Sequence, residues 1–281
     1  MRNTKTAELV LTALFAAIII IMAFTPLGYI PLVVINATII HIPVILGALF
    51  CGPKKGGFLG FVFGLTSFIK NSFIKNIVAP TSLAAFVFSP VLAASMVGTS
   101  GIFKSAFICF VPRILVGILP YYVYLGVRKA VTSENKKIWS TVLNVLIGVF
   151  LLVGCRAFIN KVFEVFDANP LSTGAVWAIS AIVGVVVFAA LEVFTLKKSG
   201  SVSAFIYAGV VGAMTNTIFV MGGIFVLYKN AYADALSIDP GAVLGVIGGV
   251  ISFNGVIEAI VAAIIVAALG VALNKIKPIQ K

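Results

Sequence analysis

Long hydrophobic runs separated by short polar connections dominate the sequence. Eight apolar segments can be drawn, at roughly 8–24, 37–51, 57–69, 105–127, 138–158, 174–196, 202–228 and 241–273. Several of them exceed the roughly 18 residues that indicate a membrane-spanning helix. The pattern predicts an all-α polytopic membrane protein with about eight transmembrane helices.

The stretch 25–66 interrupts this pattern most strongly. Pro26 and Pro31 end the first hydrophobic segment, and a polar group follows inside otherwise apolar sequence: Asn36, Thr38 and His41. Broken backbone is costly in lipid unless it lines a cavity or is buried in protein. The stretch therefore favours a binding site, and an ordinary loop that joins two spans is the alternative.

The longest connection covers residues 70–104. Residues 82–97 are apolar enough for a span, but Ser89 and Pro90 interrupt them, and a span here would move the basic cluster at 128–137 to the other side. We expect a long outer loop, partly re-entrant, that folds over the helix bundle. Loops of this length in compact proteins are usually functional.

The composition also predicts a membrane protein, and the distribution of basic residues predicts its orientation across the membrane. The chain has 281 residues, of which 61% are hydrophobic and 10% are charged, and its formal net charge is +12. With both termini in the cytoplasm, 13 basic residues fall on the inner side and 6 on the outer side, while Arg113 lies inside a span. Because basic residues favour the cytoplasmic side, we expect both termini to be cytoplasmic in a multi-pass protein of the cell membrane.

Glycines recur at helical spacing in three places: Gly56, Gly60 and Gly64; Gly209 and Gly212; and Gly245, Gly248 and Gly249. Small residues let transmembrane helices approach closely, so the spacing predicts helix packing.

Residues 138–198 form a separable helical hairpin, bounded by basic clusters and with few polar groups inside. We interpret it as an insertion into a six-helix core. The predicted organisation is core helices 1–4 at 1–137, including the outer loop, the inserted hairpin at 138–198, and core helices 5–6 at 199–281.

Four polar residues lie well inside the core segments: Arg113, Asn216, Asn254 and Glu258. An arginine at such depth costs at least about 2.5 kcal/mol, so it should face a cavity or a partner. The i, i+4 spacing places Asn254 and Glu258 on one helix face. One interpretation is a structural ion pair between Arg113 and Glu258. The other is a pocket in which Arg113 receives a ligand carboxylate or phosphate, with Glu258 behind it.

Other chemistry has little support in the sequence. His41 is the single histidine, the three cysteines are far apart, and no catalytic triad, HExxH, CxxC or GxxxxGK[ST] motif occurs. These observations predict neither a metal nor a cofactor, and they place any ATP hydrolysis in another subunit.

Several ordered motifs resemble a known family. They are the run TPLGYIPL…INAT…IHIPVILGAL…GPKKGGFLGFVFGLTS, FVFSP in the outer loop, CFVPRILVGILPYYVY, TNT…FVMGGI and NGVIEAIVAAII. Together they resemble the substrate-binding (S) components of energy-coupling-factor (ECF) vitamin transporters, and within that family the pantothenate-type branch. The resemblance covers about 1–130 and 200–275, and the hairpin at 138–198 departs from it.

The resemblance implies a six-helix subunit that captures a vitamin from outside, pantothenate in view of the branch, and docks on a transmembrane coupling subunit that carries two ATPases. It implies docking through a small-residue AxxxA face on the first helix, which Ala13 and Ala17 match, although plain helix packing explains that pair equally well. It also implies a substrate site near Asn36, His41, Phe86, Phe88, Arg113, Asn216 and Asn254. The rival interpretations are another water-soluble vitamin or precursor, or an intramembrane enzyme that uses Arg113, Asn254 and Glu258 on a lipid-like substrate.

Overall fold

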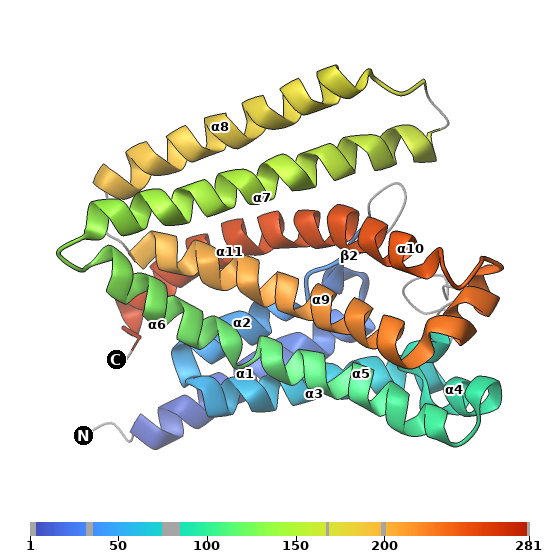
Figure 1. Ribbon diagram of the computed structural model, residues 1–281. Coiled ribbons are helices and arrows are strands. Elements are labelled where there is room, and N and C mark those ends of the chain that lie inside the picture. Colours follow the sequence, from blue (N-terminus) through green and yellow to red (C-terminus); the bar gives the residue numbers. More distant parts are fainter. Residues whose placement is uncertain (1–3, 32–35, 75–84, 167–168, 198–200, 280–281) are drawn as a thin grey trace.

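The computed structural model describes residues 4–31, 36–74, 85–166, 169–197 and 201–279 (Figure 1). Its helices are α1 (Thr4–Phe24), α2 (His41–Cys51), α3 (Pro53–Phe73), α4 (Pro90–Val97), α5 (Ser100–Val116), α6 (Leu119–Val131), α7 (Lys136–Val165), α8 (Thr173–Lys197), α9 (Ser201–Leu236), α10 (Val243–Val250) and α11 (Val256–Ile276). Short 3₁₀ turns occur at Pro26–Gly28 and Ala85–Phe88, and the π-helical turn η3 (Ile251–Gly255) joins α10 to α11. Strands β1 (Tyr29–Pro31) and β2 (Asn36–Thr38) form a small antiparallel pair.

The described part of the chain contains six helical stretches that are long and apolar enough to cross a membrane. They are Thr6–Phe24, Ser100–Val131, Lys136–Glu164, Thr173–Val193, Val202–Leu236 and Val243–Ile276. This confirms the all-helical polytopic membrane architecture. Of the remaining two predicted segments, the first forms α2, which has only 11 residues, and the second forms α3, which has 21 residues and carries three lysines.

The segment predicted as one span at 105–127 consists of two helices. Helix α5 ends at Val116 and α6 begins at Leu119, next to Pro120. At this break Gly117 lies against Gly56 of α3, and a Cβ atom built on Gly56 would come within 2.0 Å of the Gly117 carbonyl oxygen. The two backbones can approach this closely only because neither residue has a side chain.

The packing predicted from glycine spacing is confirmed at two of the three places. Gly60 and Gly64 lie against the α5 backbone at Arg113 and Cys109, and Gly209 lies against α11 at Ala262. The third place is different. A Cβ on Gly245, Gly248 or Gly249 would meet no atom within 4 Å, so these glycines of α10 do not serve close helix packing.

The break predicted at Ser89 and Pro90 is also present. Ser89 caps the eight-residue helix α4 by accepting a hydrogen bond from the Leu92 N–H at 3.3 Å. A helix of this length cannot span a bilayer. Phe86 and Val87, just before it, are buried against α5 and α9, so the described part of this connection folds onto the bundle.

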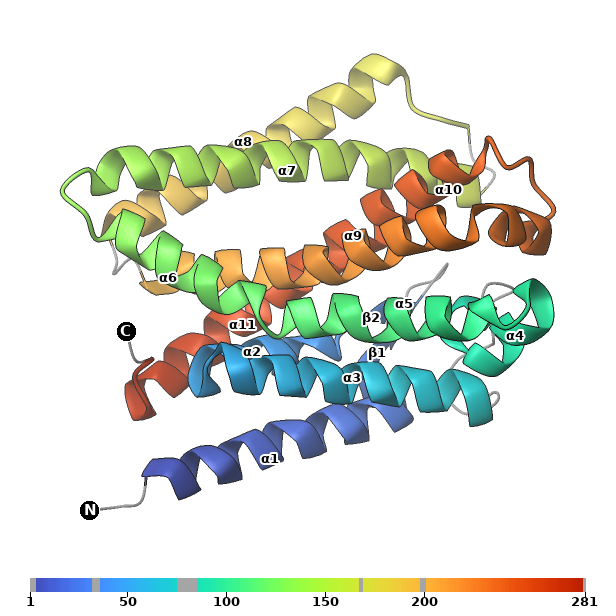
Figure 2. The same ribbon diagram turned by 60° about the horizontal axis from the view of Figure 1, so that its bottom comes forward.

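Helices α7 and α8 lie side by side along one flank of the bundle (Figures 1 and 2). Gly148 and Gly184 bring the two helices close together, and Glu192 of α8 accepts hydrogen bonds from Thr141 and Asn144 of α7 at 2.6 and 2.7 Å. The hairpin therefore has its own interhelical contacts. That it is an insertion into a six-helix core, and the domain division built on it, stay predictions.

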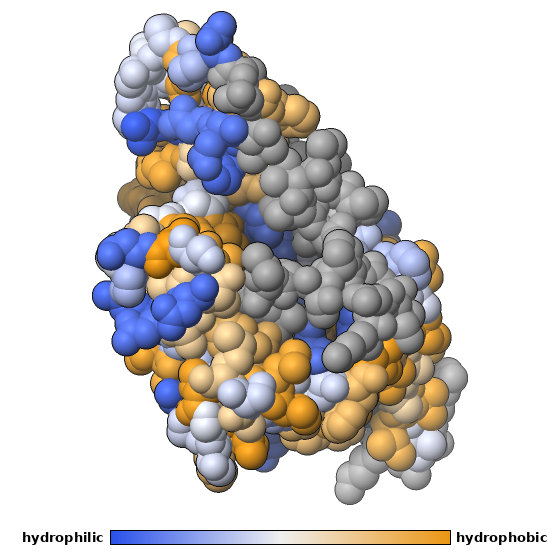
Figure 3. Space-filling model, turned by 90° about the vertical axis from the view of Figure 1, so that its right-hand side faces the viewer, coloured by the Kyte–Doolittle hydropathy of each residue, from blue (hydrophilic) through white to orange (hydrophobic). Residues whose placement is uncertain are grey.

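The start of α1 and the end of α11 lie at the same end of the bundle, together with the α2–α3 and α6–α7 turns (Figure 1). These turns carry the basic residues Lys54, Lys55, Arg128, Lys129, Lys136 and Lys137. The opposite end, formed partly by α4 and α10, is seen face-on in Figure 3, where hydrophilic side chains gather beside hydrophobic ones.

Candidate functional site

The strand pair β1–β2 is held on both sides by buried polar contacts. Thr38 of β2 donates its backbone N–H to Glu258 Oε1 of α11 at 2.8 Å. Tyr29 of β1 pairs with Thr38, and its hydroxyl accepts a hydrogen bond from Lys70 Nζ of α3 at 2.7 Å. The Lys70 ammonium also lies 4.2 Å from the centre of the Tyr29 ring, a cation–π contact. The interrupted stretch predicted to form a site is thus fixed between α3 and α11.

Arg113 is buried in α5, with 6% of its surface exposed. Its Nη1 donates to the carbonyl oxygen of Ile108, and its guanidinium carbon lies 5.5 Å from the Phe63 ring centre and 5.3 Å from that of Phe88. Its Nε has no hydrogen-bond partner in the described structure. A buried guanidinium with unused donors is suited to an anionic ligand.

Glu258 is not the ion-pair partner of Arg113. The ion pairs within 4.0 Å in the described part of the chain are Glu8–Lys55 and Lys161–Glu164. Glu258 accepts instead from Thr38 and from the Thr217 hydroxyl, the latter at 3.0 Å. The structural ion pair considered from the sequence is therefore absent, because both carboxylate oxygens are occupied by neutral donors.

His41 and Asn216 lie at similar depth in the bundle. A Cβ on Gly212 of α9 would come within 2.4 Å of the Ile45 side chain of α2, so the two helices touch there. His41 and Asn216 are each four residues, one helical turn, from that contact, toward the end with the strand pair. Both His41 ring nitrogens and the Asn216 amide oxygen are buried without a hydrogen-bond partner among the described residues.

Unpartnered buried polar atoms are rare in folded proteins and call for an explanation. In the described structure such side-chain atoms belong to His41, Arg113, Tyr124 and Asn216. Three of these four residues are ones that the sequence predicts to bind substrate, and they come from α2, α5 and α9. A polar ligand with donors and acceptors would supply the missing partners.

Phe86 and Phe88 have different surroundings. Phe86 is buried and packs edge-on against Tyr228 of α9, with ring centres 5.5 Å apart. Its carbonyl accepts from the Ser105 hydroxyl at 3.4 Å. Phe88 is only partly buried and faces Arg113. Phe86 therefore anchors the segment, while Phe88 contributes to the surroundings of the guanidinium.

Comparison of the sequence with known proteins identifies the family of this chain. A family model described as "ECF transporter, substrate-specific component" matches residues 7–270. The chain belongs to this family of ECF transporter S components. The predicted family is thus confirmed, and the chain is a transport subunit of the membrane rather than an enzyme.

Two relatives resemble this S component over most of their length. The pantothenic acid transporter PanT of Lactococcus lactis subsp. cremoris is 34% identical over 203 residues, which cover 64% of this chain and 97% of that protein. The pantothenate transporter PanT of Leuconostoc mesenteroides subsp. mesenteroides is 32% identical over 169 residues, covering 58% of this chain and 68% of that protein. About a third of the S component thus lies outside the match to the first relative.

Ala13 and Ala17 lie on the exposed side of α1 in the S component. Large apolar side chains surround them on this side, including Leu9 at 68% exposed and Ile21 at 54%. Packing within the described bundle, the alternative considered from the sequence, therefore does not account for the two alanines.

The structure does not bring every predicted residue to the candidate site. Asn254 lies in the π-helical turn η3 and lines a separate cavity of about 400 Å³ with Lys161 and Glu164 of α7. Glu258, four residues further on, does not line this cavity and accepts hydrogen bonds from Thr38 and Thr217. Asn36 begins β2, paired with Pro31, and its side chain lies outside the described residues.

Sequence reasoning missed several residues that contact the candidate site: Tyr29, Phe63, Lys70 and Thr217. Thr217 could have been found, since it adjoins Asn216 within one polar run of a hydrophobic helix. Lys70 was assigned to the outer loop, yet it lies in the last turn of α3. Its pairing with Tyr29 links positions 41 residues apart, which no local pattern reveals.

Proposed function

We propose that this S component binds pantothenate and delivers it to an ATP-driven importer. The observation that carries the proposal is Arg113, a buried guanidinium with no carboxylate within 4.0 Å in the described structure. Pantothenate has one carboxylate, which Arg113 would receive through a charge-assisted, two-pronged hydrogen bond. The names of the two relatives support the same substrate.

The other polar groups of pantothenate suit the unpartnered side chains of His41 and Asn216. The ligand also carries hydroxyls and an amide, which both donate and accept hydrogen bonds. A neutral histidine offers one donor and one acceptor, and an asparagine offers both, so His41 and Asn216 match these groups. Phe88 would cover the carboxylate side, and Asn36 is proposed as a ligand residue from the sequence alone. We leave Asn254 out of the proposed site because it lines the other cavity.

We further propose that the subunit works with a transmembrane coupling subunit and two ATPases. The exposed face of α1 supports this, because Ala13 and Ala17 would let a coupling helix approach closely. Both termini would be cytoplasmic, and the vitamin would enter from the other side. The grouping of α1's start, α11's end and the basic turns at one end of the bundle supports this orientation.

Calorimetric titration of the purified chain with pantothenate tests the proposal. We expect one molecule bound per chain and the same molecule recovered unchanged after incubation. Thiamine, riboflavin and biotin serve as comparisons, since each is a water-soluble vitamin of different shape and charge. Tighter binding of another vitamin would contradict pantothenate as the substrate. Chemical conversion of the ligand would contradict the proposed function and favour the rival interpretation as an intramembrane enzyme.

A further inference from the structure

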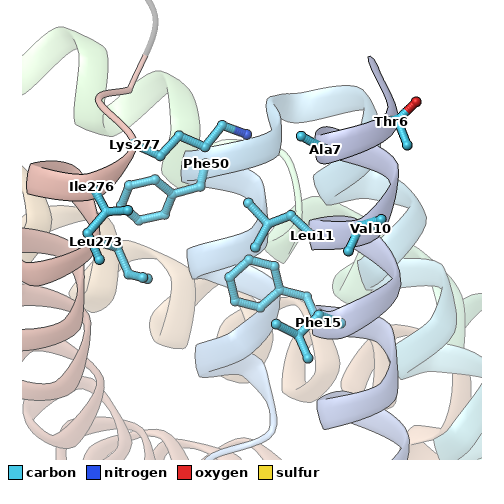
Figure 4. A pocket seen from close by; sticks show the side chains of 10 residues that line it. Thr6, Ala7, Val10, Leu11, Phe15, Phe50, Leu273, Ile276 and Lys277 are labelled. Carbon is cyan, nitrogen blue, oxygen red and sulfur yellow. The ribbon is translucent and has the colours of Figure 1, made fainter. Parts of the chain in front are cut away.

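A cavity of about 550 Å³ opens between α1 and α11 at the end of the bundle where α1 begins and α11 ends (Figure 4). Its walls are almost entirely apolar and are contributed by Ala7, Val10, Leu11, Leu14 and Phe15 of α1, Phe50 of α2, and Leu273 and Ile276 of α11. The start of α1 and the end of α11, which line it, lie away from the strand pair β1–β2 (Figure 2), and neither Arg113 nor a strand residue lines it. The cavity therefore does not belong to the proposed vitamin site.

The polar side chains that line the cavity are Thr6 and Lys277, which Figure 4 places on the same side as Ala7, with Phe15 on the opposite side. Thr6 and Phe15 are nine residues apart, about 14 Å along a helix. That length matches the hydrocarbon depth of one leaflet, half of about 30 Å. The cavity thus combines a polar rim with an apolar interior of leaflet depth.

The rim carries excess positive charge. Among the described residues, no carboxylate lies within 4.0 Å of the Lys277 ammonium. Glu8, an acidic group close enough to feel the Lys277 charge, is bonded to Lys55 at 2.5 Å. Lys55 and Lys277 together outweigh Glu8 by one charge, so an anion would be attracted to this rim.

We propose that this cavity binds an anionic phospholipid. One acyl chain lies between α1 and α11 along Leu11, Phe15 and Leu273, and the phosphate meets Lys277. Burial of the acyl methylenes favours binding, and basic pockets between transmembrane helices bind anionic head groups. A helix of a partner protein is a weaker candidate, because the exposed Ala13 and Ala17 lie on a different side of α1 from Leu11 and Phe15.

Thermal unfolding of the purified full chain in detergent tests the head group. Dioleoyl phosphatidylglycerol should stabilise the chain at a concentration about fivefold lower than dioleoyl phosphatidylcholine, the effect of one lysine near a phosphate. Lys277→Gln should abolish this difference. Lys275→Gln is the matched control, since Lys275 is exposed and does not line the cavity, and it should keep the difference.

A second variant tests the acyl chain. Ala7 is an exposed residue on the cavity wall, so Ala7→Phe should fill the space without disturbing the core and should remove stabilisation by both lipids. Glycerol phosphate, which has the head group's charge but no chain, should have no effect on any variant. Unchanged vitamin binding confirms that each variant is folded.

Three results would overturn the proposal. Equal stabilisation by the two lipids would remove the role of charge. An equal loss in Lys275→Gln and Lys277→Gln would indicate general attraction to a basic surface. If the lipids stabilised Ala7→Phe as much as the unchanged chain, the lipid would bind elsewhere, and a protein partner would be the better occupant of the cavity.

Discussion

Glu258 accepts a hydrogen bond from the backbone N–H of Thr38 across 220 positions of sequence, with the two atoms 2.8 Å apart. Its other oxygen accepts from Thr217, the neighbour of Asn216. Thr38 precedes His41 by three residues. A single carboxylate thus joins the segments that carry two of the proposed ligand-binding residues.

Replacing Glu258 should weaken vitamin binding through these two segments. Glu258→Ala leaves the Thr38 N–H and the Thr217 hydroxyl without an acceptor, a loss of about 1–3 kcal/mol for a buried group. Glu258→Gln retains one acceptor and should lose less. Thermal unfolding measures stability, and calorimetry measures pantothenate affinity. If Glu258→Ala lowered stability but left affinity intact, the carboxylate would serve the fold alone.

Changing Arg113 tests the centre of the proposed site. Arg113→Lys keeps the charge but loses the planar fork, so pantothenate binding should weaken by about 1–3 kcal/mol. Arg113→Gln removes the charge and should weaken binding further. Because Glu258 is satisfied by Thr38 and Thr217, the glutamine variant should remain folded. Normal affinity in Arg113→Lys, measured by calorimetry, would place the ligand carboxylate elsewhere.

The exposed face of α1 can be tested without touching the vitamin site. Replacing Ala13 and Ala17 together with leucine adds bulk where a coupling helix would approach, so uptake of labelled pantothenate into cells should be lost. The isolated subunit should still bind the vitamin. Replacement of both by serine, which stays small, is the control and should preserve uptake. A joint loss of binding and uptake in the leucine variant would assign the face to folding.

Cysteine labelling in intact cells tests the orientation. In a chain whose Cys51, Cys109 and Cys155 are replaced by alanine, a cysteine at the exposed Lys275 should resist an impermeant reagent. A cysteine at Ser172, in the exposed turn between α7 and α8, should react. The basic residues at the end with the termini predict this pattern. The reverse pattern would invert the topology.

The sequence by itself determined which long segments are apolar enough to cross a membrane. Hydropathy is a local property, so runs such as 8–24 and 174–196 identified α1 and α8 from length and composition alone. Local backbone chemistry also determined the break at Ser89 and Pro90, where α4 begins. The energetic cost of a buried charge identified Arg113 before any contact was known.

The tertiary structure decided which side chains meet. Gly56 lies against Gly117, Lys70 bonds Tyr29, and Glu258 bonds Thr38 rather than Arg113. These contacts depend on how helices far apart in sequence rotate and slide against one another, which a one-dimensional pattern does not encode. Asn254 shows the same limit, because its cavity is completed by Lys161 and Glu164 of α7, nearly a hundred positions earlier in the chain.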